Sequence, residues 1–210
     1  GTGKTAAFGL PMIQRIDVKK NIVQGLVIAP TRELCVQISN DFKAFSKFIK
    51  GLSVATIYGG ASMDKQAKEI RSGAQIVVAT PGRLMDLMKR RMIKINRVSY
   101  VVLDEADEML NMGFKEDIDG ILEHTPTEKL TWLFSATMPK EVAKISKSYM
   151  SNPLEITVGH KNVGAENIQH VYYSIPERER YKAVKRILDF NPNIYLSLIH
   201  ISEPTRRPKI

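Results

Sequence analysis

The first residues of the chain have the composition of a loop that holds phosphate groups. In order they are Gly1, Thr2, Gly3, Lys4 and Thr5. Glycines let backbone N–H groups close around phosphate oxygens, a lysine reaches the β- and γ-phosphates of a nucleotide, and a threonine hydroxyl binds Mg²⁺. A helix that begins here adds its N-terminal dipole. The segment predicts a nucleotide-binding loop, and a glycine-rich turn with an exposed lysine is the alternative for this pattern taken alone.

A pair of carboxylates follows an apolar run further along the chain. Asp104 and Glu105 come directly after residues 100–103, which predict a buried strand. Ligands of parallel α/β sheets bind at the carboxyl ends of the strands, so both side chains are expected at such an edge. We expect Asp104 to hold Mg²⁺ and Glu105 to orient and polarise a water molecule. A solvated acidic helix start would explain one carboxylate, but not its combination with the Gly-Lys-Thr loop. The combination predicts hydrolysis of a nucleoside triphosphate.

Short patterns of glycine, hydroxyl and arginine residues follow other apolar runs. In chain order they are Pro30, Thr31 and Arg32; Gly59 and Gly60; Thr80, Pro81, Gly82 and Arg83; and Ser135, Ala136 and Thr137. Hydroxyls, backbone N–H groups and arginines suit contacts with phosphate, and such contacts carry no base information. Each pattern alone also fits an ordinary turn or strand end.

In this order, and with Asp104-Glu105-Ala106-Asp107 among them, the motifs resemble those of the DEAD-box RNA helicases of superfamily 2, bacterial members in particular. The resemblance covers residues 1–195. One departure is Cys35, where the family usually has alanine; a small buried cysteine fits such a position. The resemblance implies ATP-dependent RNA unwinding, with ATP and Mg²⁺ as cofactors and RNA as the partner. Ribosomal or RNA-decay assemblies are the settings it suggests.

The resemblance also implies a role for each motif. The catalytic residues are expected to be Lys4, Asp104 and Glu105. The metal is expected to bind to Thr5 and Asp104, and the nucleotide to the segment from Gly1 to Thr5. Contacts with the RNA backbone fall to Pro30, Thr31, Arg32, Gly59, Gly60, Thr80, Pro81, Gly82 and Arg83. Ser135 and Thr137 are expected to couple the two sites through bonds to the acidic motif at Asp107.

Three alternatives stay open. A P-loop kinase or a DNA-directed helicase shares the Gly-Lys-Thr loop, but neither explains Asp-Glu-Ala-Asp together with Ser-Ala-Thr. A protein that clamps RNA when it binds ATP, without productive unwinding, would use the same motifs. The presence of Glu105 favours hydrolysis over an inert site.

Composition limits the class of protein. The chain has 210 residues, of which 43% are hydrophobic and 25% charged, so it is long enough for a globular core. The net charge of +9 suits a polyanionic partner. A single cysteine excludes an internal disulfide, and the four histidines show no metal-ligand spacing. Because no run has the apolar length of a membrane span and no signal peptide is visible, we expect a cytoplasmic protein without a membrane partner.

Apolar runs alternate with helical patterns over most of the chain. Strands are predicted at 26–29, 54–57, 76–79, 101–103, 131–134 and 154–158, and amphipathic helices at 33–48, 64–72 and 84–90. The first helix, after Lys4, is expected to kink or end early at Pro11. The alternation predicts an α/β fold with a parallel sheet covered by helices on both faces. This is the RecA-like P-loop domain that the resemblance implies.

The domain organisation follows from composition and the resemblance. We expect a first RecA-like domain at 1–158, a polar linker at 159–167 and the start of a second RecA-like domain at 168–195, with a strand at 168–175 and a helix at 177–188. Residues 196–210 are predicted to be a non-native tail, because 196–206 match a translated transposase-type sequencing adapter. The opening inside a motif suggests a gene fragment. Because the family's second domain supplies arginine fingers, we expect this chain alone to be inactive.

Overall fold

The computed structural model describes residues 3–157 and 171–192. The chain forms two compact units, 1–162 and 163–210, so the division falls inside the predicted linker; the domain boundaries themselves stay a prediction. Linker 159–167 and tail 196–210 lie outside the described residues. None of the helices in the described parts of the chain is long and apolar enough to cross a bilayer.

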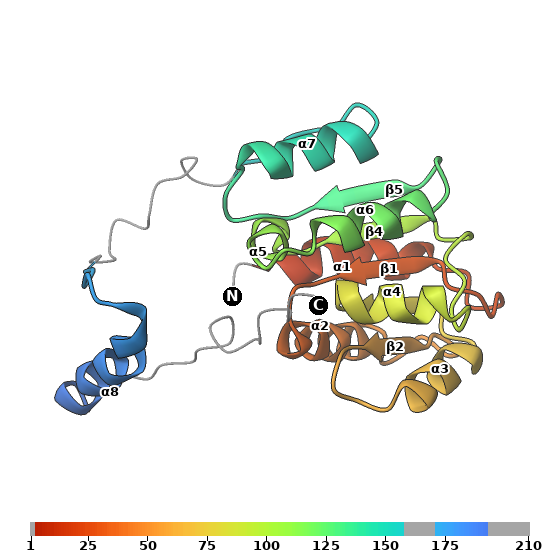
Figure 1. Cartoon of the computed structure of the whole chain (residues 1–210). Coiled ribbons are helices and arrows are strands. Elements are labelled where there is room, and N and C mark those ends of the chain that lie inside the picture. Colours follow the sequence, from red (N-terminus) through yellow and green to blue (C-terminus); the bar gives the residue numbers. More distant parts are fainter. Residues whose placement is uncertain (1–2, 158–170, 193–210) are drawn as a thin grey trace. The chain divides into compact units, whose positions relative to one another are not determined.

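The first unit is built on one sheet of five strands (Figure 1). They are β1 (Gly25–Ile28), β2 (Val54–Ile57), β3 (Ile76–Ala79), β4 (Tyr100–Leu103) and β5 (Leu130–Leu133). Their order across the sheet is β2-β3-β1-β4-β5, and every neighbouring pair is parallel. The predicted α/β class and parallel sheet are confirmed. The strands therefore share one carboxyl edge, where they all end, and one amino edge, where they all begin.

Helices occupy the connections between the strands. They are α1 (Lys4–Arg15), α2 (Arg32–Phe45), α3 (Met63–Arg71), α4 (Pro81–Lys89), α5 (Ala106–Asn111), α6 (Lys115–Glu123) and α7 (Lys140–Tyr149). The predicted helices at 33–48, 64–72 and 84–90 are confirmed with shifted ends. Side chains define some of these starts: the Thr31 hydroxyl accepts the Leu34 N–H at 3.2 Å, and Ser62 caps α3 in the same way. Pro81 takes the first position of α4, where a missing N–H costs nothing.

Two apolar cores lie on opposite faces of the sheet. On β1, Leu26 and Ile28 belong to the core under α3 to α7, whereas Val27 belongs to the core under α1 and α2. This period of two follows from the alternation of side chains along a strand buried on both faces. Cys35 of α2 packs fully buried in the second core, and burial raises the pKa of its thiol, so it behaves as a small apolar side chain.

The first helix does not end early at Pro11. α1 continues to Arg15, so the predicted early end is wrong, whereas the predicted kink stays a prediction. Phe8, Met12 and Ile13, on either side of the proline, are buried against the sheet. Most helix stability in proteins comes from such packing, which here outweighs the backbone hydrogen bond that proline cannot make.

Two predicted strands are absent among the described residues. Residues 154–157 form no strand, and the side chains of Leu154 and Ile156 are 85% and 79% exposed. Residues 171–175 are likewise outside any strand. A strand is stable only when a neighbour satisfies its N–H and C=O groups, and an apolar alternation does not supply that neighbour.

The second unit contains helical structure at the predicted place. A 3₁₀-turn, η1 (Glu177–Glu179), leads into α8 (Arg180–Phe190), so the helix predicted at 177–188 is confirmed. Its Lys185 and Asp189 form an ion pair one turn apart at 2.6 Å. Tyr181 and Phe190 of this helix are 80% and 87% exposed.

Gly25 at the start of β1 allows α1 to pack closely on the sheet. A Cβ placed there would lie 2.6 Å from the sulfur of fully buried Met12. We expect Gly25→Ala to lower the free energy of unfolding by about 1–3 kcal/mol, because buried Met12 has to shift in a close-packed core. Denaturant unfolding measures the effect. Gly59→Ala is the matched control, since nothing lies within 4 Å of its Cβ position, and equal unfolding midpoints for both variants would contradict the prediction.

Candidate functional site

The described part of the predicted phosphate loop is the start of α1. Gly3 precedes the helix with a left-handed backbone (φ 74°), which glycine adopts without strain, and Lys4 and Thr5 form the first turn. N–H groups in the first turn of a helix have no partner within the helix. The start of α1 therefore offers donors, a cation and a hydroxyl to an anion, as the sequence predicts. Gly1 and Thr2 lie outside the described residues.

Asp104 is a buried carboxylate at the carboxyl end of β4. Only 3% of its surface is exposed, and its N–H donates to the Ile28 carbonyl at 2.9 Å, which extends the pairing with β1. Burial raises the pKa of Asp104, and the positive charge of Lys4 counteracts this rise. The two predicted site residues, which lie far apart in sequence, therefore interact electrostatically at this edge.

Glu105 turns the chain sharply from β4 into α5. Its backbone is left-handed (φ 52°), an uncommon conformation for a residue with a side chain and one that is often found at functional sites. Its N–H donates to an Asp104 carboxylate oxygen at 3.1 Å, and the next N–H, of Ala106, donates to the Phe134 carbonyl at 3.0 Å. These bonds fix the two carboxylates relative to each other and to the end of β5.

Asp107 is bonded to the segment after β5. Its carboxylate accepts the Thr137 hydroxyl at 2.7 Å and the Thr137 N–H at 2.8 Å, and its own N–H donates to the Ser135 hydroxyl at 3.2 Å. Burial raises the pKa of Asp107, but the hydrogen bonds from Thr137 and Ser135 outweigh it and lower the pKa below its ordinary value. The ionised carboxylate thus holds the Ser-Ala-Thr segment in place.

The donor set fits one magnesium ion that also binds phosphate. Among residues 3–157 and 171–192, no group of three or more His, Cys, Asp and Glu side chains gathers as a protein metal cage. Mg²⁺ does not need one, because it keeps several waters and binds through one or two carboxylates together with substrate phosphates. The Asp104 carboxylate and the Thr5 hydroxyl supply this minimal chemistry. A divalent cation would also compensate the charge that Asp104 buries.

The first predicted RNA loop offers an exposed arginine but a buried threonine. Pro30 and Thr31 are buried, and the Thr31 hydroxyl is used to cap α2. Arg32 is exposed, and its guanidinium lies 4.8 Å from the centre of the Tyr58 ring. This cation–π contact orients the guanidinium between the loop after β1 and the loop after β2. Arg32 is therefore the side chain of this motif that is available to a phosphate.

The glycine pair and the loop after β3 expose mainly backbone. Gly59 and Gly60 are exposed, Gly60 is left-handed (φ 80°), and nothing lies within 4 Å of either Cβ position. A partner can therefore approach this backbone closely. Thr80 and Gly82 are partly exposed at the start of α4, whereas Pro81 between them is buried. These loops belong to the same carboxyl edge as Asp104.

Arg83, predicted to contact RNA, is engaged within the protein. Its guanidinium donates to the Ala61 carbonyl at 2.9 Å and to the Gln66 side-chain oxygen at 3.2 Å. The Gln66 amide in turn donates to the Tyr58 carbonyl at 3.0 Å. Sequence reasoning missed Gln66, although a polar residue on the apolar face of the helix predicted at 64–72 was a usable signal. Together Arg83 and Gln66 brace the loop that carries the glycine pair.

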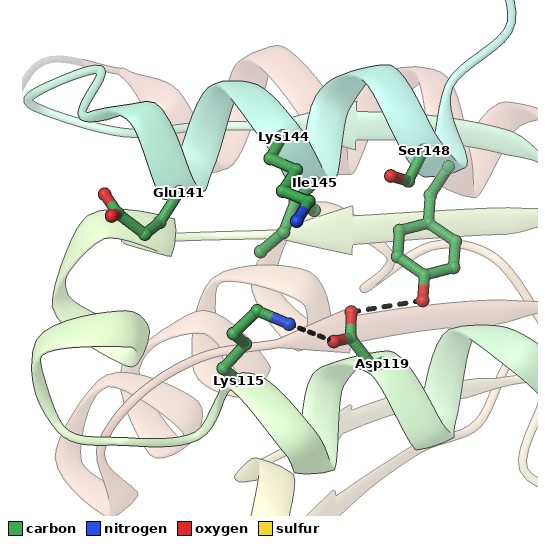
Figure 2. Close-up of a pocket in the computed structure, with 7 residues that line it drawn as sticks. Lys115, Asp119, Glu141, Lys144, Ile145 and Ser148 are labelled. Atoms are coloured by element: carbon green, nitrogen blue, oxygen red, sulfur yellow. Dashed lines mark hydrogen bonds and ion pairs between the residues drawn. The ribbon is translucent and has the colours of Figure 1, made fainter.

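A small hollow lies between α6 and α7, apart from the predicted motifs (Figure 2). Its volume is about 120 Å³. The Asp119 carboxylate at its wall accepts the Tyr149 hydroxyl at 3.1 Å and pairs with Lys115 at 2.6 Å. Burial and Asp119 raise the pKa of Tyr149 to about 12, so its hydroxyl remains a donor. Because Asp119 pairs with both Lys115 and Tyr149, we interpret the hollow as part of the packing contact between α6 and α7, which holds α7 in place.

Comparison with known protein families agrees with this geometry. A family model described as DEAD/DEAH box helicase matches residues 1–145, which include every predicted site residue.

Curated relatives match over most of the chain. The DEAD-box ATP-dependent RNA helicase CshA of Streptococcus pneumoniae is 46% identical over 90% of this chain and 36% of its own length. The ATP-dependent RNA helicase DeaD of Mycobacterium tuberculosis is 44% identical over 91% of this chain and 34% of its own length. The chain thus spans about a third of the length of these relatives.

Solved structures give the same result for the fold. A DEAD box protein from the hyperthermophile Methanococcus jannaschii has a TM-score of 0.72 and 39% identity, covering 93% of this chain and 52% of that one. It supports the RecA-like fold that the sequence predicted, and the match of the family model to residues 1–145 supports the motif order. The chain belongs to the DEAD/DEAH box helicase family.

Proposed function

We propose that the protein containing this chain is an ATP-dependent RNA helicase that hydrolyses the ATP phosphoanhydride and uses it to open short RNA duplexes. The observation that carries the proposal is the buried Asp104 carboxylate at the carboxyl edge, next to Glu105 and within the field of Lys4. The names of the relatives, RNA helicases that depend on ATP, support the same activity. Bacterial relatives make RNA remodelling in ribosomal or RNA-decay assemblies, in the cytoplasm, the setting that we propose.

The nucleotide is held by the start of α1. Lys4 binds the β- and γ-phosphates, and the N–H groups of the first turn donate to phosphate oxygens. Thr5 and Asp104 would hold Mg²⁺, which would neutralise charge that develops on the phosphates. Because Asp104 is buried, a bound cation would also compensate its charge.

Glu105 positions and polarises the attacking water. The turn at Glu105 is fixed by its N–H bond to Asp104 and by the bond from Ala106 to Phe134. A carboxylate held at the end of the same strand as the metal ligand can accept a proton from water as it attacks the γ-phosphate. Positioning of this kind, rather than covalent chemistry, supplies most of the rate in phosphoryl transfer.

RNA is held at the same edge through its sugar-phosphate backbone. Arg32 supplies the cation, and the backbone at Gly59, Gly60 and Gly82 supplies N–H donors. Thr80 offers its hydroxyl, because its own N–H donates to the Ile57 carbonyl at 2.9 Å. None of these groups reads a base edge, so binding with little sequence preference is expected. Arg83 takes part indirectly, by bracing the loop of the glycine pair through Ala61.

Asp107 links the two ligands. The carboxylate lies three residues after the proposed metal ligand Asp104, and it holds Thr137 of the Ser-Ala-Thr segment by two hydrogen bonds. Movement at Asp104 and Glu105 on nucleotide binding therefore reaches Ser135 and Thr137 through bonds that already exist. We propose that these bonds transmit the nucleotide state to the RNA-binding edge.

Replacing the proposed base removes hydrolysis without removing ATP binding. For Glu105→Gln in the protein that contains this chain, we expect RNA-stimulated phosphate release to fall by about 10² to 10⁴-fold, because the amide cannot accept the water's proton. A fluorescent ATP analogue should bind as before. Glu108→Gln, a carboxylate on the same helix that pairs with Asn111, is the control. Turnover by Glu105→Gln at the control rate would refute the assignment.

Replacing the proposed metal ligand should stabilise the protein while inactivating it. Burial raises the folded-state pKa of Asp104, so its ionised form destabilises the fold in the absence of nucleotide. We expect Asp104→Asn to raise the free energy of unfolding at neutral pH by on the order of 1 kcal/mol, and to abolish hydrolysis. The gain should grow as pH rises from about 4 and level off above the folded-state pKa.

Thermal unfolding across this pH range measures the effect. Asp86→Asn, at an exposed position of α4, is the matched control and should change the unfolding temperature little. An Asp104→Asn variant that is less stable than the unaltered protein at every pH would mean that the buried charge is already compensated.

Removing the Thr137 hydroxyl should weaken the coupling between the ligands. Thr137→Val keeps the shape of the side chain but loses the 2.7 Å bond to Asp107. We expect RNA stimulation of hydrolysis to fall roughly tenfold with ATP affinity nearly unchanged, since one hydrogen bond to a charged group is lost. Thr137→Ser keeps the donor and should retain most of the stimulation. Equal stimulation in both variants would exclude the hydroxyl from coupling.

A further inference from the structure

Basic residues gather at the amino edge of the sheet, opposite the proposed site. Because all five strands are parallel, every connection that enters a strand reaches this edge (Figure 1). Lys47 precedes β2, Lys19 and Lys20 precede β1, and the segment 91–99 before β4 carries three further cations. These six exposed residues, called the basic edge below, are Lys19, Lys20, Lys47, Arg91, Lys94 and Arg97.

The loops that leave the strands at the carboxyl edge carry few cations. The connections that leave the strands, residues 29–31, 58–62, 80, 104–105 and 134–139, contain no lysine or arginine. Their charged residues are Asp104 and Glu105. The net charge of +9, which the sequence analysis linked to RNA binding, is therefore not concentrated where the motifs lie. The exposed cations of the basic edge give the amino edge an attraction for polyanions.

The segment before β4 presents its cations from an anchored backbone. Ile93, Ile95 and Val98 are almost fully buried, whereas Lys94 and Arg97 between them are exposed. The three apolar side chains pack in the core and anchor the segment. The backbone positions of Lys94 and Arg97 are therefore fixed by this packing. No ion pair involves Lys94 or Arg97 within residues 3–157 and 171–192.

Arg91 occupies a position that favours glycine. The Arg91 N–H donates to the Met88 carbonyl at 2.9 Å, and the Met92 N–H donates to the Leu87 carbonyl at 2.8 Å, the Schellman pattern that ends α4. Arg91 itself is left-handed (φ 56°), which is strained for a residue with a side chain. An exposed arginine at a position where glycine would be less strained is consistent with a use for its charge.

An aromatic ring lies beside the basic residues at the β2 end of this edge. Phe48 is 89% exposed, and the Lys47 ammonium lies 5.6 Å from the centre of its ring. An exposed aromatic side chain next to cations is the arrangement on which single-stranded nucleic acids stack their bases. An acidic protein surface would pair with the cations, but it would have no base to stack on the Phe48 ring, so this arrangement favours a nucleic acid.

We propose that the basic edge is a second RNA-binding surface, which holds the phosphate backbone of an RNA segment beyond the one bound at the carboxyl edge. The proposal rests on the proposed function, because it assumes an RNA substrate. β2 and β4 lie three strand spacings apart, or ~14 Å. That width matches roughly four phosphates of one strand in a nucleic-acid helix. Contacts of this kind are independent of sequence and of ATP.

The test measures RNA binding by the 210-residue chain without nucleotide, by fluorescence anisotropy of a labelled single-stranded RNA at several salt concentrations. The variant combines Arg91→Gly, Lys94→Gln and Arg97→Gln. We expect weaker binding and a decrease of about 2 in the slope of log affinity against log salt, since three phosphate contacts are lost. Arg91→Gly also relieves the strained turn, so the unfolding temperature should not fall.

A charge-matched control removes three exposed lysines from helix faces: Lys68→Gln, Lys144→Gln and Lys147→Gln. Its affinity and salt slope should stay close to those of the unaltered chain. Phe48→Leu, which keeps an apolar side chain but removes the ring, should weaken binding on the order of tenfold. Equal weakening by both triple variants would overturn the proposal, because total charge alone would then explain the binding. Displacement of RNA by polyglutamate as effective as by unlabelled RNA would overturn it in favour of an acidic protein partner.

An Arg32→Gln variant separates this inference from the proposed function. Weakening by Arg32→Gln alone overturns the basic edge and leaves RNA binding at the carboxyl edge intact. Weakening by the triple variant alone supports the basic edge and overturns the RNA contact assigned to Arg32. Weakening by both supports both surfaces, and an unaltered chain that binds no RNA overturns both.

Discussion

Parallel pairing of five short strands is the constraint on which the structure depends. Each strand has four residues, and β1 to β4 are largely buried while the edge strand β5 is only partly so, and helices cover the sheet on both sides. Parallel strands also cannot be joined by tight turns, and every connection has to cross from one edge to the other. All strand-to-helix loops therefore meet at the carboxyl edge. Residues as distant in sequence as Lys4, Arg32 and Asp104 come together there for topological reasons.

The carboxyl edge carries groups that reduce the stability of the fold. Asp104 is a carboxylate with almost no exposure, and Glu105 bends the backbone into a left-handed conformation. Both features oppose folding and are typical of sites at which a ligand binds. Asp107 has the opposite effect, because its hydrogen bonds with Ser135 and Thr137 stabilise its ionised form. Asp107, whose hydrogen bonds are made within the protein, thus stabilises the site, whereas the buried charge of Asp104 destabilises it.

Charge is separated between the two edges of the same sheet. The groups that we propose to bind phosphate at the carboxyl edge are mostly neutral donors, which suits close contacts beside two carboxylates. The six cations of the basic edge lie at the amino edge, away from Lys4, Asp104 and Glu105. An anionic polymer attracted by the long-range field would meet the amino edge first, while the short-range contacts of Arg32 and the glycine pair hold it at the motifs.

The sequence by itself predicted the five strands, most helices of the first unit, the parallel sheet and the positions of the motifs. Hydrophobic periodicity, the residues that end helices and strands, and the residue types of loops are all local features of the sequence. Tertiary structure decided what depends on neighbours. Packing of Phe8 and Met12 lets α1 continue past Pro11, and without a pairing strand residues 154–157 form no strand. The sequence also could not predict the hydrogen-bond partners of Arg83. The same holds for the bonds between Asp107 and Thr137, which lie thirty residues apart. A hydrogen bond depends on where the fold places both partners, and only the packed chain fixes that distance.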